Sequence, residues 1–110
     1  MEKVKILKEN RDFHRLYRKG KSLVNPLVVI YYSKNNNKET RFGITTGKKI
    51  GNAVKRNRAR RIIRAAFYEV SPLLNGHYDF VFVARGKTPF KKSTDIKKVM
   101  EKQFKENNLI

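Results

Sequence analysis

The sequence predicts an α+β fold in which one mixed sheet is covered by helices, as in a two-layer α/β sandwich. Short runs rich in β-branched and aromatic residues alternate with longer segments whose apolar residues recur at helical spacing. The expected order of elements is α-β-β-α-β-α. No internal repeat, Pro-rich linker or Gly/Ser tract divides the chain, and its hydrophobic fraction of 39% is enough for one modest core. We therefore expect residues 1–110 to form a single domain.

The first predicted element is a short helix after Asn10. Asparagine is a favoured N-cap residue, and the apolar residues Phe13, Leu16 and Tyr17 follow at positions i, i+3 and i+4. Gly20 stands where a C-cap in the left-handed conformation would end the helix. Asn10 and Gly20 therefore bound this element.

Two strands joined by a polar hairpin loop are expected next. Residues 27–32 are rich in β-branched and aromatic side chains, which favours a strand. Residues 34–38 place three asparagines between two lysines, a composition typical of a turn. Residues 41–46 are then the returning strand of the hairpin.

The second half of the chain is expected to contain two helices and one strand. A long helix is predicted over residues 52–70, ended by Ser71 and Pro72, and a buried strand over residues 78–84. Thr94 is expected to cap the last helix. The apolar residues of that helix share one face, namely Ile96, Val99, Met100 and Phe104.

The charge of the chain is its strongest functional signal. It contains 27 Lys and Arg residues against nine Asp and Glu, a net charge of +18. Repulsion of this size works against the compact state, so we expect a polyanionic partner, most commonly nucleic acid. A membrane surface is the competing partner. It is disfavoured because the sequence has no Trp and no long amphipathic segment with bulky anchors.

Missing residues exclude or disfavour other classes of protein. The absence of cysteine excludes disulfides, thiolate metal sites and a Cys nucleophile. The N-terminus resembles no secretory signal, and the longest bulky apolar run, residues 27–32, is too short to span a bilayer, so we expect a cytoplasmic protein without a membrane partner. The two histidines are isolated, the aspartates are scattered and no serine has the context of a nucleophile. A catalytic site within the protein is therefore not expected.

Basic residues are densest on the long helix. Residues 40–68 contain nine Lys or Arg and no acid. The apolar stripe of the helix consists of Ala59, Ile62, Ile63, Ala66 and Val70. The opposite side consists of Asn57, Arg60, Arg61, Arg64 and Tyr68, with Arg56 and Arg58 on its flanks. A merely solvated face would mix charges of both signs, and five of the six basic residues from Lys55 to Arg64 are Arg, which suits phosphate contacts. We therefore expect this side to bind RNA.

Residues 43–49 superficially resemble a phosphate-binding loop of nucleotide-binding proteins. The spacer is one residue short, and Lys49 occupies the place of the Mg-binding Ser or Thr, so this interpretation is rejected. Gly47 and Gly51 instead predict a tight strand-to-helix turn. Its backbone N–H groups, with Lys48 and Lys49, are expected to meet an RNA phosphate.

The aromatic residues divide between core and possible base-stacking positions. Phe42, Phe80, Phe82 and Phe104 are expected in the core. For Phe13, Tyr17 and Tyr31 the pattern alone favours the core as well, and the alternative is a stacking platform for unpaired bases.

The run from residue 41 to residue 64 resembles the protein subunit of bacterial ribonuclease P. The match comprises Arg41-Phe42-Gly43-Ile44-Thr45 and the whole segment from Lys48 to Arg64, centred on Arg56-Asn57-Arg58. It extends over roughly residues 7–104 and is highly specific between Lys48 and Arg64. The resemblance implies a fold like the second domain of ribosomal protein S5. That fold has a left-handed βαβ crossover, whereas about 98% of such connections are right-handed.

The resemblance also implies a function. Proteins of this family bind a large catalytic RNA, and the complex removes the 5′ leader of precursor tRNA by Mg²⁺-dependent hydrolysis. The RNA carries the chemistry and, with the substrate, holds the Mg²⁺, and no protein partner is required. The implied RNA-binding residues are Lys48, Lys49, Lys55, Arg56, Asn57, Arg58, Arg60, Arg61 and Arg64.

A cleft for the single-stranded leader is a further implication. By motif position it would be lined by Phe13, Tyr17, Tyr31, Asn57, Arg60 and Arg64, which reverses the pattern-based preference for the three aromatics. Arg56, Arg58 and Arg61 would contact the catalytic RNA. Two positions depart from the family pattern: Tyr17 stands where Phe is frequent, and Gly47 where a small hydroxyl residue is common.

Two other classes of protein remain open on the sequence alone. A ribosomal protein would share the size and charge, although such proteins usually carry their basic residues on extended tails. A protein-only nuclease would cleave precursor tRNA without any other RNA. The identity of a co-purified RNA separates the first alternative from ribonuclease P, and cleavage by the protein alone would identify the second.

Overall fold

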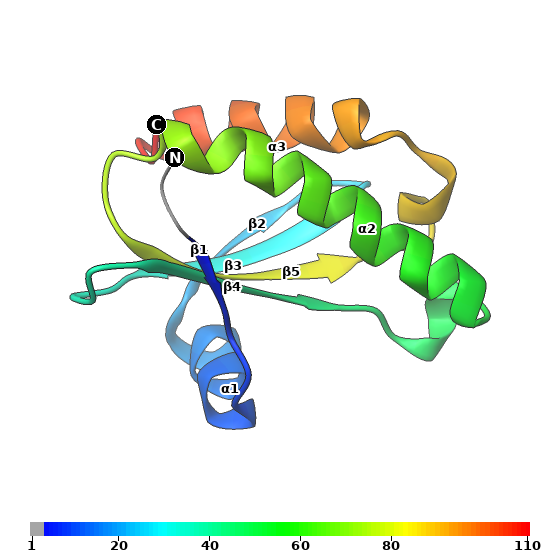
Figure 1. The fold of residues 1–110 in the computed structure, drawn as a ribbon, viewed down its shortest axis with the longest axis horizontal. Helices are drawn as coiled ribbons and strands as arrows, with labels where there is room; N and C mark the ends of the chain where they lie inside the picture. The colour runs from blue at the N-terminus through cyan, green and yellow to red at the C-terminus, as the bar shows by residue number, and fades with distance from the viewer. Residues whose placement is uncertain (1–3) are drawn as a thin grey trace.

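The computed structural model describes residues 4–110 as a five-stranded sheet with three helices (Figure 1). The strands are β1 (Val4–Ile6), β2 (Lys21–Val24), β3 (Val28–Lys34), β4 (Thr40–Thr45) and β5 (Tyr78–Ala84). The helices are α1 (Asn10–Lys19), α2 (Ala53–Val70) and α3 (Ser93–Glu106). Three short 3₁₀ turns accompany them, η1 (Lys48–Ile50), η2 (Ser71–Leu73) and η3 (Thr88–Phe90). The predicted α+β fold with one mixed sheet is confirmed.

The predicted hairpin between β3 and β4 is wrong. The strand order is β1-β4-β5-β3-β2, so β5 lies between the two strands, antiparallel to β3 and parallel to β4. β5 is buried on both faces over most of its length, and such a strand belongs in the middle of a sheet. The loop after β3 therefore passes the end of β5, where the Asn35 N–H donates to the carbonyl of His77.

Two edge strands were not predicted. β1 and β2 contain only three and four residues, and most of their side chains are exposed or half-buried. Segments of three or four residues are too short for an alternating pattern to be recognised, and they form strands because β4 and β3 offer them free edges. The observed order of strands and helices is therefore β-α-β-β-β-α-β-α rather than α-β-β-α-β-α.

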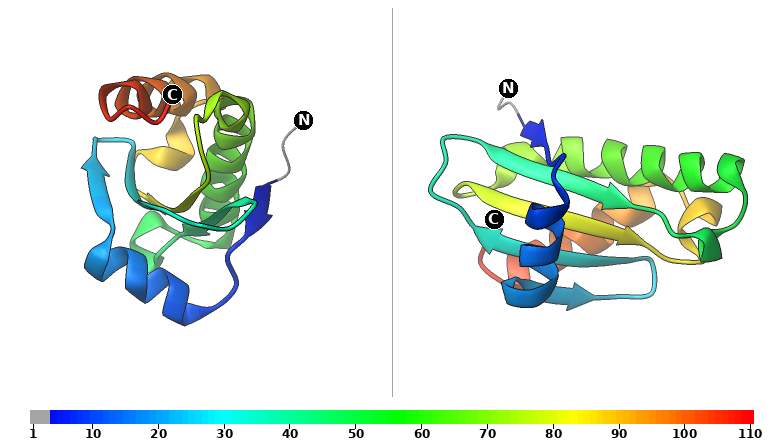
Figure 2. Two further views of the ribbon diagram at one scale, coloured as in Figure 1. Left: turned by 90° about the vertical axis from the view of Figure 1, so that its left-hand side faces the viewer. Right: turned by 90° about the horizontal axis from the view of Figure 1, so that it is seen from below.

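The connection from β4 through α2 to β5 is a left-handed crossover. The two strands are parallel neighbours, and α2 lies against one face of the sheet (Figure 1). With α2 in front of the sheet and both strands pointing upward, β5 lies to the left of β4, as Figures 1 and 2 show together. This agrees with the handedness that the family resemblance implies.

The ends of α1 differ from the prediction. The N-cap is Glu9, and Asn10 is already the first helical residue. Gly20 has φ −73° and is extended rather than left-handed. It is needed for space instead, because a Cβ there would lie 2.6 Å from the carbonyl oxygen of Leu16 and 3.0 Å from that of Tyr32.

The ends of the two longer helices agree only in part with the prediction. Asn52, expected as the first residue of the long helix, is instead its N-cap, and α2 ends at Val70 before η2, as predicted. Thr94 does not cap α3, because the helix begins one residue earlier, with Lys92 as its N-cap. The backbone N–H of Lys92 donates to Oδ2 of Asp95 at 2.9 Å, so the carboxylate supplies the cap.

The main core lies between the sheet and the helices α2 and α3, whereas α1 covers part of the opposite face (Figures 1 and 2). The main core is dominated by the fully buried rings of Phe42, Phe67, Phe80, Phe82 and Phe104. Four of these were predicted. Phe67, which was not, follows Ile63 by one helical turn and contacts the rings of Phe42, Phe80 and Phe82. The core beneath α1 is much smaller and consists of Leu7, Leu16 and Val81.

Candidate nucleic-acid interface

The turn into α2 depends on a glycine and an asparagine. Gly51 has φ 133°, a conformation that residues with side chains rarely adopt. Oδ1 of Asn52 accepts a hydrogen bond from the N–H of Lys55 at 3.0 Å and caps the helix. The tight turn expected here is confirmed, and it leaves Lys48 and Lys49 exposed beside the positive end of the helix dipole. Their contact with a phosphate stays a prediction.

Arg56 has a partner within the protein that the sequence did not indicate. Its Nη1 donates to the carbonyl oxygen of Gly51 at 2.7 Å, and the side chain is half-buried. Arg56 therefore stabilises the turn into α2. The neighbouring side chains of Lys55 and Arg58 are exposed.

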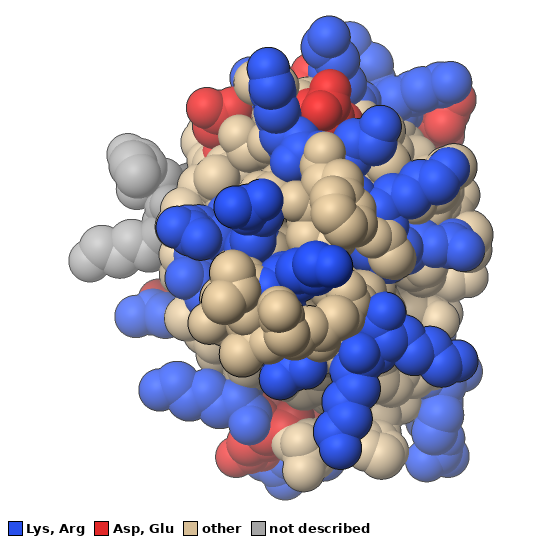
Figure 3. Space-filling model, turned by 90° about the vertical axis from the view of Figure 1, so that its right-hand side faces the viewer, with Lys and Arg blue, Asp and Glu red and all other residues tan. Residues whose placement is uncertain are grey.

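The other arginines of α2 divide between two flanks of the helix. Arg60 and Arg64 line a groove at the β1–β4 edge of the sheet, and Arg58 and Arg61 line a hollow beside η3. Within residues 4–110, none of these four arginines forms an ion pair with a carboxylate. Figure 3 views the end of the molecule where α2 begins and shows basic side chains spread over the face, with few acidic ones. The single arginine face expected from the helical period is thus two surfaces with different neighbours.

The groove on the first flank has a volume of about 140 Å³ and combines an aromatic ring with two cations. Phe13 from α1, Gly43 from β4, and Arg60 and Arg64 from α2 line it. Arg60 is held in place because its Nη2 donates to Oγ1 of Thr46 at 2.8 Å and its Nη1 to Oδ1 of Asn57 at 3.3 Å. Four residues assigned to a leader cleft, Phe13, Asn57, Arg60 and Arg64, are therefore brought together.

Gly43 is the residue that lets the ring of Phe13 lie against the sheet. A Cβ at position 43 would lie 2.3 Å from Cζ and 2.8 Å from Cε2 of that ring. Any residue with a side chain at position 43 would push the ring of Phe13 out of the groove. The sequence showed Gly43 only as part of a motif, and its role becomes visible only when α1 lies across β4.

Tyr17 and Tyr31 form a second aromatic pair on the same face of the sheet. Their ring centroids are 5.0 Å apart in an edge-to-face arrangement, with Tyr17 exposed and Tyr31 half-buried. Tyr31 lies on β3, and β5 separates that strand from the β4 strand beneath Phe13. The pair does not line the groove of Phe13 and Arg60. All three aromatics nevertheless lie outside the main core.

A buried carboxylate that was not among the predicted functional residues fixes α1 above the sheet. Asp79 on β5 accepts two hydrogen bonds from Arg41, at 2.9 Å from Nε and 2.7 Å from Nη2. It also accepts from Nη2 of Arg15 on α1 at 2.7 Å and from Nδ2 of Asn35 at 2.8 Å. The available signal was a single acid inside the otherwise apolar strand of residues 78–84, since a buried charge requires partners.

The network around Asp79 also favours the charged form of Arg41. The hydrogen bond that Arg41 donates to Asp79, aided by the nearby carboxylate of Asp12, raises the pKa of Arg41 above its ordinary value, although burial acts in the opposite direction. Arg15 contacts Asp12 as well, at 3.4 Å. These charge-assisted bonds tie one turn of α1 to β4 and β5 and so hold Phe13 over the groove.

Metal ligands are sparse in the part of the chain that the structure describes. Residues 4–110 contain no group of three or more His, Asp or Glu side chains that could hold an ion. The acids nearest the groove are already engaged, since Asp12 and Asp79 pair with arginines. The described residues therefore do not fit a magnesium site of their own. None of the helices in this part is long and apolar enough to cross a membrane.

Comparison with known proteins gives one consistent result. A model of the family Ribonuclease P matches residues 1–108. The chain is 41% identical over 99 residues to the ribonuclease P protein component of Oceanobacillus iheyensis, covering 89% of this chain and 82% of the relative. It is 38% identical over 108 residues to that of Caldanaerobacter subterraneus, covering 98% and 93%.

Solved structures agree with the sequence relatives. The RNase P protein of Staphylococcus aureus superimposes with a TM-score of 0.82 at 32% identity, covering 97% of this chain and 98% of that one. The RNase P protein of Thermotoga maritima gives a TM-score of 0.80 at 26% identity, covering 93% and 96%.

Proposed function

Because this chain belongs to the bacterial ribonuclease P protein family, we infer that it is the protein component of a ribonuclease P ribonucleoprotein and propose how it contacts RNA. We propose that it binds the catalytic RNA of that enzyme and the 5′ leader of precursor tRNA. The complex would then hydrolyse the phosphodiester that joins the leader to the mature 5′ end. We place the protein in the cytoplasm and expect no protein partner to be required.

The observation that carries the proposal is the groove between α1, β4 and α2. It places the half-buried ring of Phe13 beside Arg60 and Arg64, neither of which pairs with a carboxylate within residues 4–110. An unpaired base can stack on an aromatic ring, and guanidinium groups can contact the flanking phosphates. This combination suits a single strand better than a duplex, whose bases are already stacked.

The leader path would continue from the groove toward the second aromatic pair. Tyr17 lies one helical turn after Phe13 on α1, and its ring meets that of Tyr31 on β3. A single-stranded RNA leader that crosses this face of the sheet would meet Asn57, Arg60 and Arg64 first and the tyrosines next. The three aromatics would then form the stacking platform for the leader.

The catalytic RNA would occupy the rest of the basic surface. We assign to it the exposed residues at the start of α2 and on its second flank, namely Lys48, Lys49, Lys55, Arg58 and Arg61. Arg56 contributes positive charge from its position against Gly51. The RNA would carry the chemistry.

Magnesium would be held by the catalytic RNA and the substrate. Bound there, Mg²⁺ would activate the attacking water and stabilise the leaving oxygen. The protein's part would be to hold the leader and to neutralise phosphate charge around the reacting strand.

Reconstitution with the catalytic RNA of the same organism tests the proposal. Holoenzyme affinity should be measured for precursor tRNAs whose leaders increase from zero to several nucleotides. Affinity is expected to rise with leader length until the groove is filled and then to level off. Equal affinity for mature and precursor tRNA would contradict the leader groove.

Two controls separate the alternative functions. Cleavage of precursor tRNA in Mg²⁺ without any other RNA would identify a protein-only nuclease. Selective binding of ribosomal RNA over the catalytic RNA would identify a ribosomal protein.

A further inference from the structure

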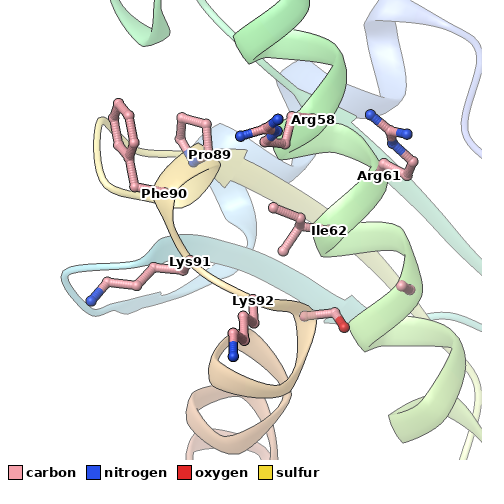
Figure 4. A pocket seen from close by; sticks show the side chains of 9 residues that line it. Arg58, Arg61, Ile62, Pro89, Phe90, Lys91 and Lys92 are labelled. Atoms are coloured by element: carbon pink, nitrogen blue, oxygen red, sulfur yellow. The ribbon is translucent and has the colours of Figure 1, made fainter.

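The second flank of α2 borders a shallow hollow that the leader groove does not include. It has a volume of about 630 Å³, within the range of small-molecule-sized sites. Its lining includes the apolar Ile62 together with Arg58, Arg61, Phe90, Lys91 and Lys92. Figure 4 shows Arg58 reaching from α2 toward Pro89, with Phe90 at the outer rim of the loop.

Phe90 is held in an exposed position by a well-anchored turn. Its side chain is 69% exposed. Thr88, two residues before Phe90, is fully buried. Its hydroxyl donates to the carbonyl of Leu27 at 2.6 Å and accepts from the N–H of Arg85 at 2.8 Å. The N–H of Phe90 donates to the carbonyl of Lys87 at 3.1 Å. The ring is thus presented to solvent with little backbone freedom left to lose on binding.

The charge around the hollow is entirely positive. Arg58, Arg61, Lys91 and Lys92 line it, and Nζ of Lys55 lies 5.4 Å from the centre of the Phe90 ring, within cation–π distance. No carboxylate is among the lining residues. Asp95, the nearest acid in sequence, is used as the cap of α3. The ligand that fits is an anion that also carries an aromatic face, which describes a nucleotide.

A similar turn elsewhere in the chain shows that exposure of an apolar side chain does not by itself make a site. η2 has the sequence Ser71-Pro72-Leu73, parallel to Thr88-Pro89-Phe90 in η3, and Leu73 is 54% exposed. Residues 69–84 contain no Lys or Arg. The same local structure therefore presents an apolar side chain twice, and it is the side chain of η3 that shares a hollow with cations.

We propose that this hollow binds an unpaired nucleotide of the catalytic RNA, whose base stacks on Phe90 while its phosphates contact Arg58, Arg61 and Lys92. The proposal rests on the function proposed above, since the RNA is that of the enzyme. The site lies on the opposite flank of α2 from the Phe13 groove, so the leader and the catalytic RNA would hold the helix from two sides. Phe90 would add a base-stacking contact to the phosphate contacts of α2.

Binding of the isolated catalytic RNA to four proteins tests the site: the wild type, Phe90→Ala, Phe90→Tyr and Leu73→Ala. Phe90→Ala should weaken the complex by about 5- to 150-fold, the loss of one stacked base. Phe90→Tyr keeps the stacking face and should bind like the wild type. Leu73→Ala, the matched truncation in η2, should also bind like the wild type. All four should melt at similar temperatures, because both side chains are largely exposed.

The outcomes separate this inference from the function on which it rests. If Phe90→Ala binds the catalytic RNA as tightly as the wild type does, the stacking site is overturned. The proposed function would still stand if the holoenzyme cleaves precursor tRNA. A second contrary result is that Phe90→Ala binds the catalytic RNA normally while its holoenzyme loses affinity only for leader-bearing precursor tRNA. That result would overturn the choice of the catalytic RNA as ligand. An equal loss in Leu73→Ala would show a general effect of truncating exposed apolar residues and would also overturn the site. Failure of the wild type to bind the catalytic RNA would overturn both proposals.

Discussion

The two faces of the sheet use the same residue types for different purposes, and adjacent tyrosines on β3 show the contrast. Tyr32 points toward α2 and α3, is buried, and contacts the rings of Tyr78 and Phe80. Tyr31 points toward α1, is half-buried, and meets the exposed ring of Tyr17. The face of the sheet, rather than the residue type, decides whether a ring stabilises the fold or stays accessible to a ligand.

The two faces also differ in what holds them together. The α2–α3 face is a large apolar cluster that includes five fully buried phenylalanines. The α1 face has three buried apolar residues and is fastened by the hydrogen bonds to Asp79. Fewer buried apolar contacts imply a lower local stability, which suits a surface that must accept a ligand.

The largest effect is expected from truncating a side chain of the apolar α2–α3 face. Phe80→Ala removes a fully buried ring that contacts the rings of Phe67, Phe82 and Phe104, and should lower the free energy of unfolding by about 3–5 kcal/mol. Urea unfolding of the free protein measures the change. Tyr17→Ala, on the other face, is the matched control and should cost far less. Similar losses in both variants would remove the contrast between the faces.

Breaking the polar fastening should have the next largest effect. Asp79→Asn keeps the shape of the side chain but leaves Arg15 and Arg41 only their longer contacts with Asp12, at 3.4 Å and 3.9 Å. Removing one partner of a fully buried pair costs about 3–5 kcal/mol, and we expect less here because these arginine side chains remain 44% and 27% exposed. Hydrogen exchange should show faster opening of α1 than of α2.

A surface ion pair provides the control for that experiment. Glu69→Gln removes the contact of Glu69 with Lys97 at 3.3 Å on the solvent side of the helices and should change stability by less than about 1 kcal/mol. A loss as large as that of Asp79→Asn would mean that net charge, rather than the buried network, is responsible.

Effects on binding alone are expected from the accessible aromatics. Phe13→Ala, Tyr17→Ala and Tyr31→Ala should each weaken holoenzyme binding of precursor tRNA by about 1–3 kcal/mol per stacked base and leave binding of mature tRNA unchanged. Affinities for both RNAs and the melting temperature of each protein should be measured. Severe destabilisation with equal losses for the two RNAs would return these residues to a structural role.

Gly43→Ala sharpens this test without removing any aromatic ring. The new Cβ would force the ring of Phe13 out of the groove, so the leader-dependent loss should equal that of Phe13→Ala. Adding Gly43→Ala to Phe13→Ala should then have little further effect. Additive losses would show that Gly43 acts through something other than the ring.

The smallest effects are expected in the salt dependence of RNA binding. Variants on each flank of α2 allow the two flanks to be compared. Replacing Arg58 and Arg61 by Gln should flatten the dependence of catalytic RNA affinity on salt by roughly 0.7–0.9 log units of slope for each phosphate that the protein no longer neutralises. Replacing Arg60 and Arg64 should act mainly on leader-bearing substrate. Arg56 is left unchanged in both variants. Because its side chain donates a hydrogen bond to the carbonyl of Gly51, replacing it would change the stability of the turn as well as RNA binding. Identical slopes in all proteins would exclude phosphate binding on both flanks.

Much of the fold could be predicted from local patterns. The strand Tyr78–Ala84, the long helix, and four of the five core phenylalanines follow from periodicity and composition. The acid-free run of residues 40–68 marked the basic surface for the same reason. These features depend only on residues close together in the chain, where spacing translates directly into a shared face.

The features that could not be predicted all depend on contacts between distant residues. β1 and β2 are strands only because neighbouring strands offer them an edge, and β5 separates β3 from β4 because it is buried on both sides. The bonds from Arg15 and Arg41 to Asp79 bridge 64 and 38 positions along the chain. No local period contains such pairings.

By itself, then, the sequence determined that a basic amphipathic helix and a set of aromatic residues exist, because helical period and charge are properties of consecutive residues. Only the tertiary structure decided which rings are accessible and which arginines share a groove with them. The ring of Phe13 meets Arg60 and Arg64 because Gly43 leaves space for it and because Asp79 ties α1 across β4 and β5. A binding surface of this kind is a relation between elements, set by packing and by a buried charge that must find its partners.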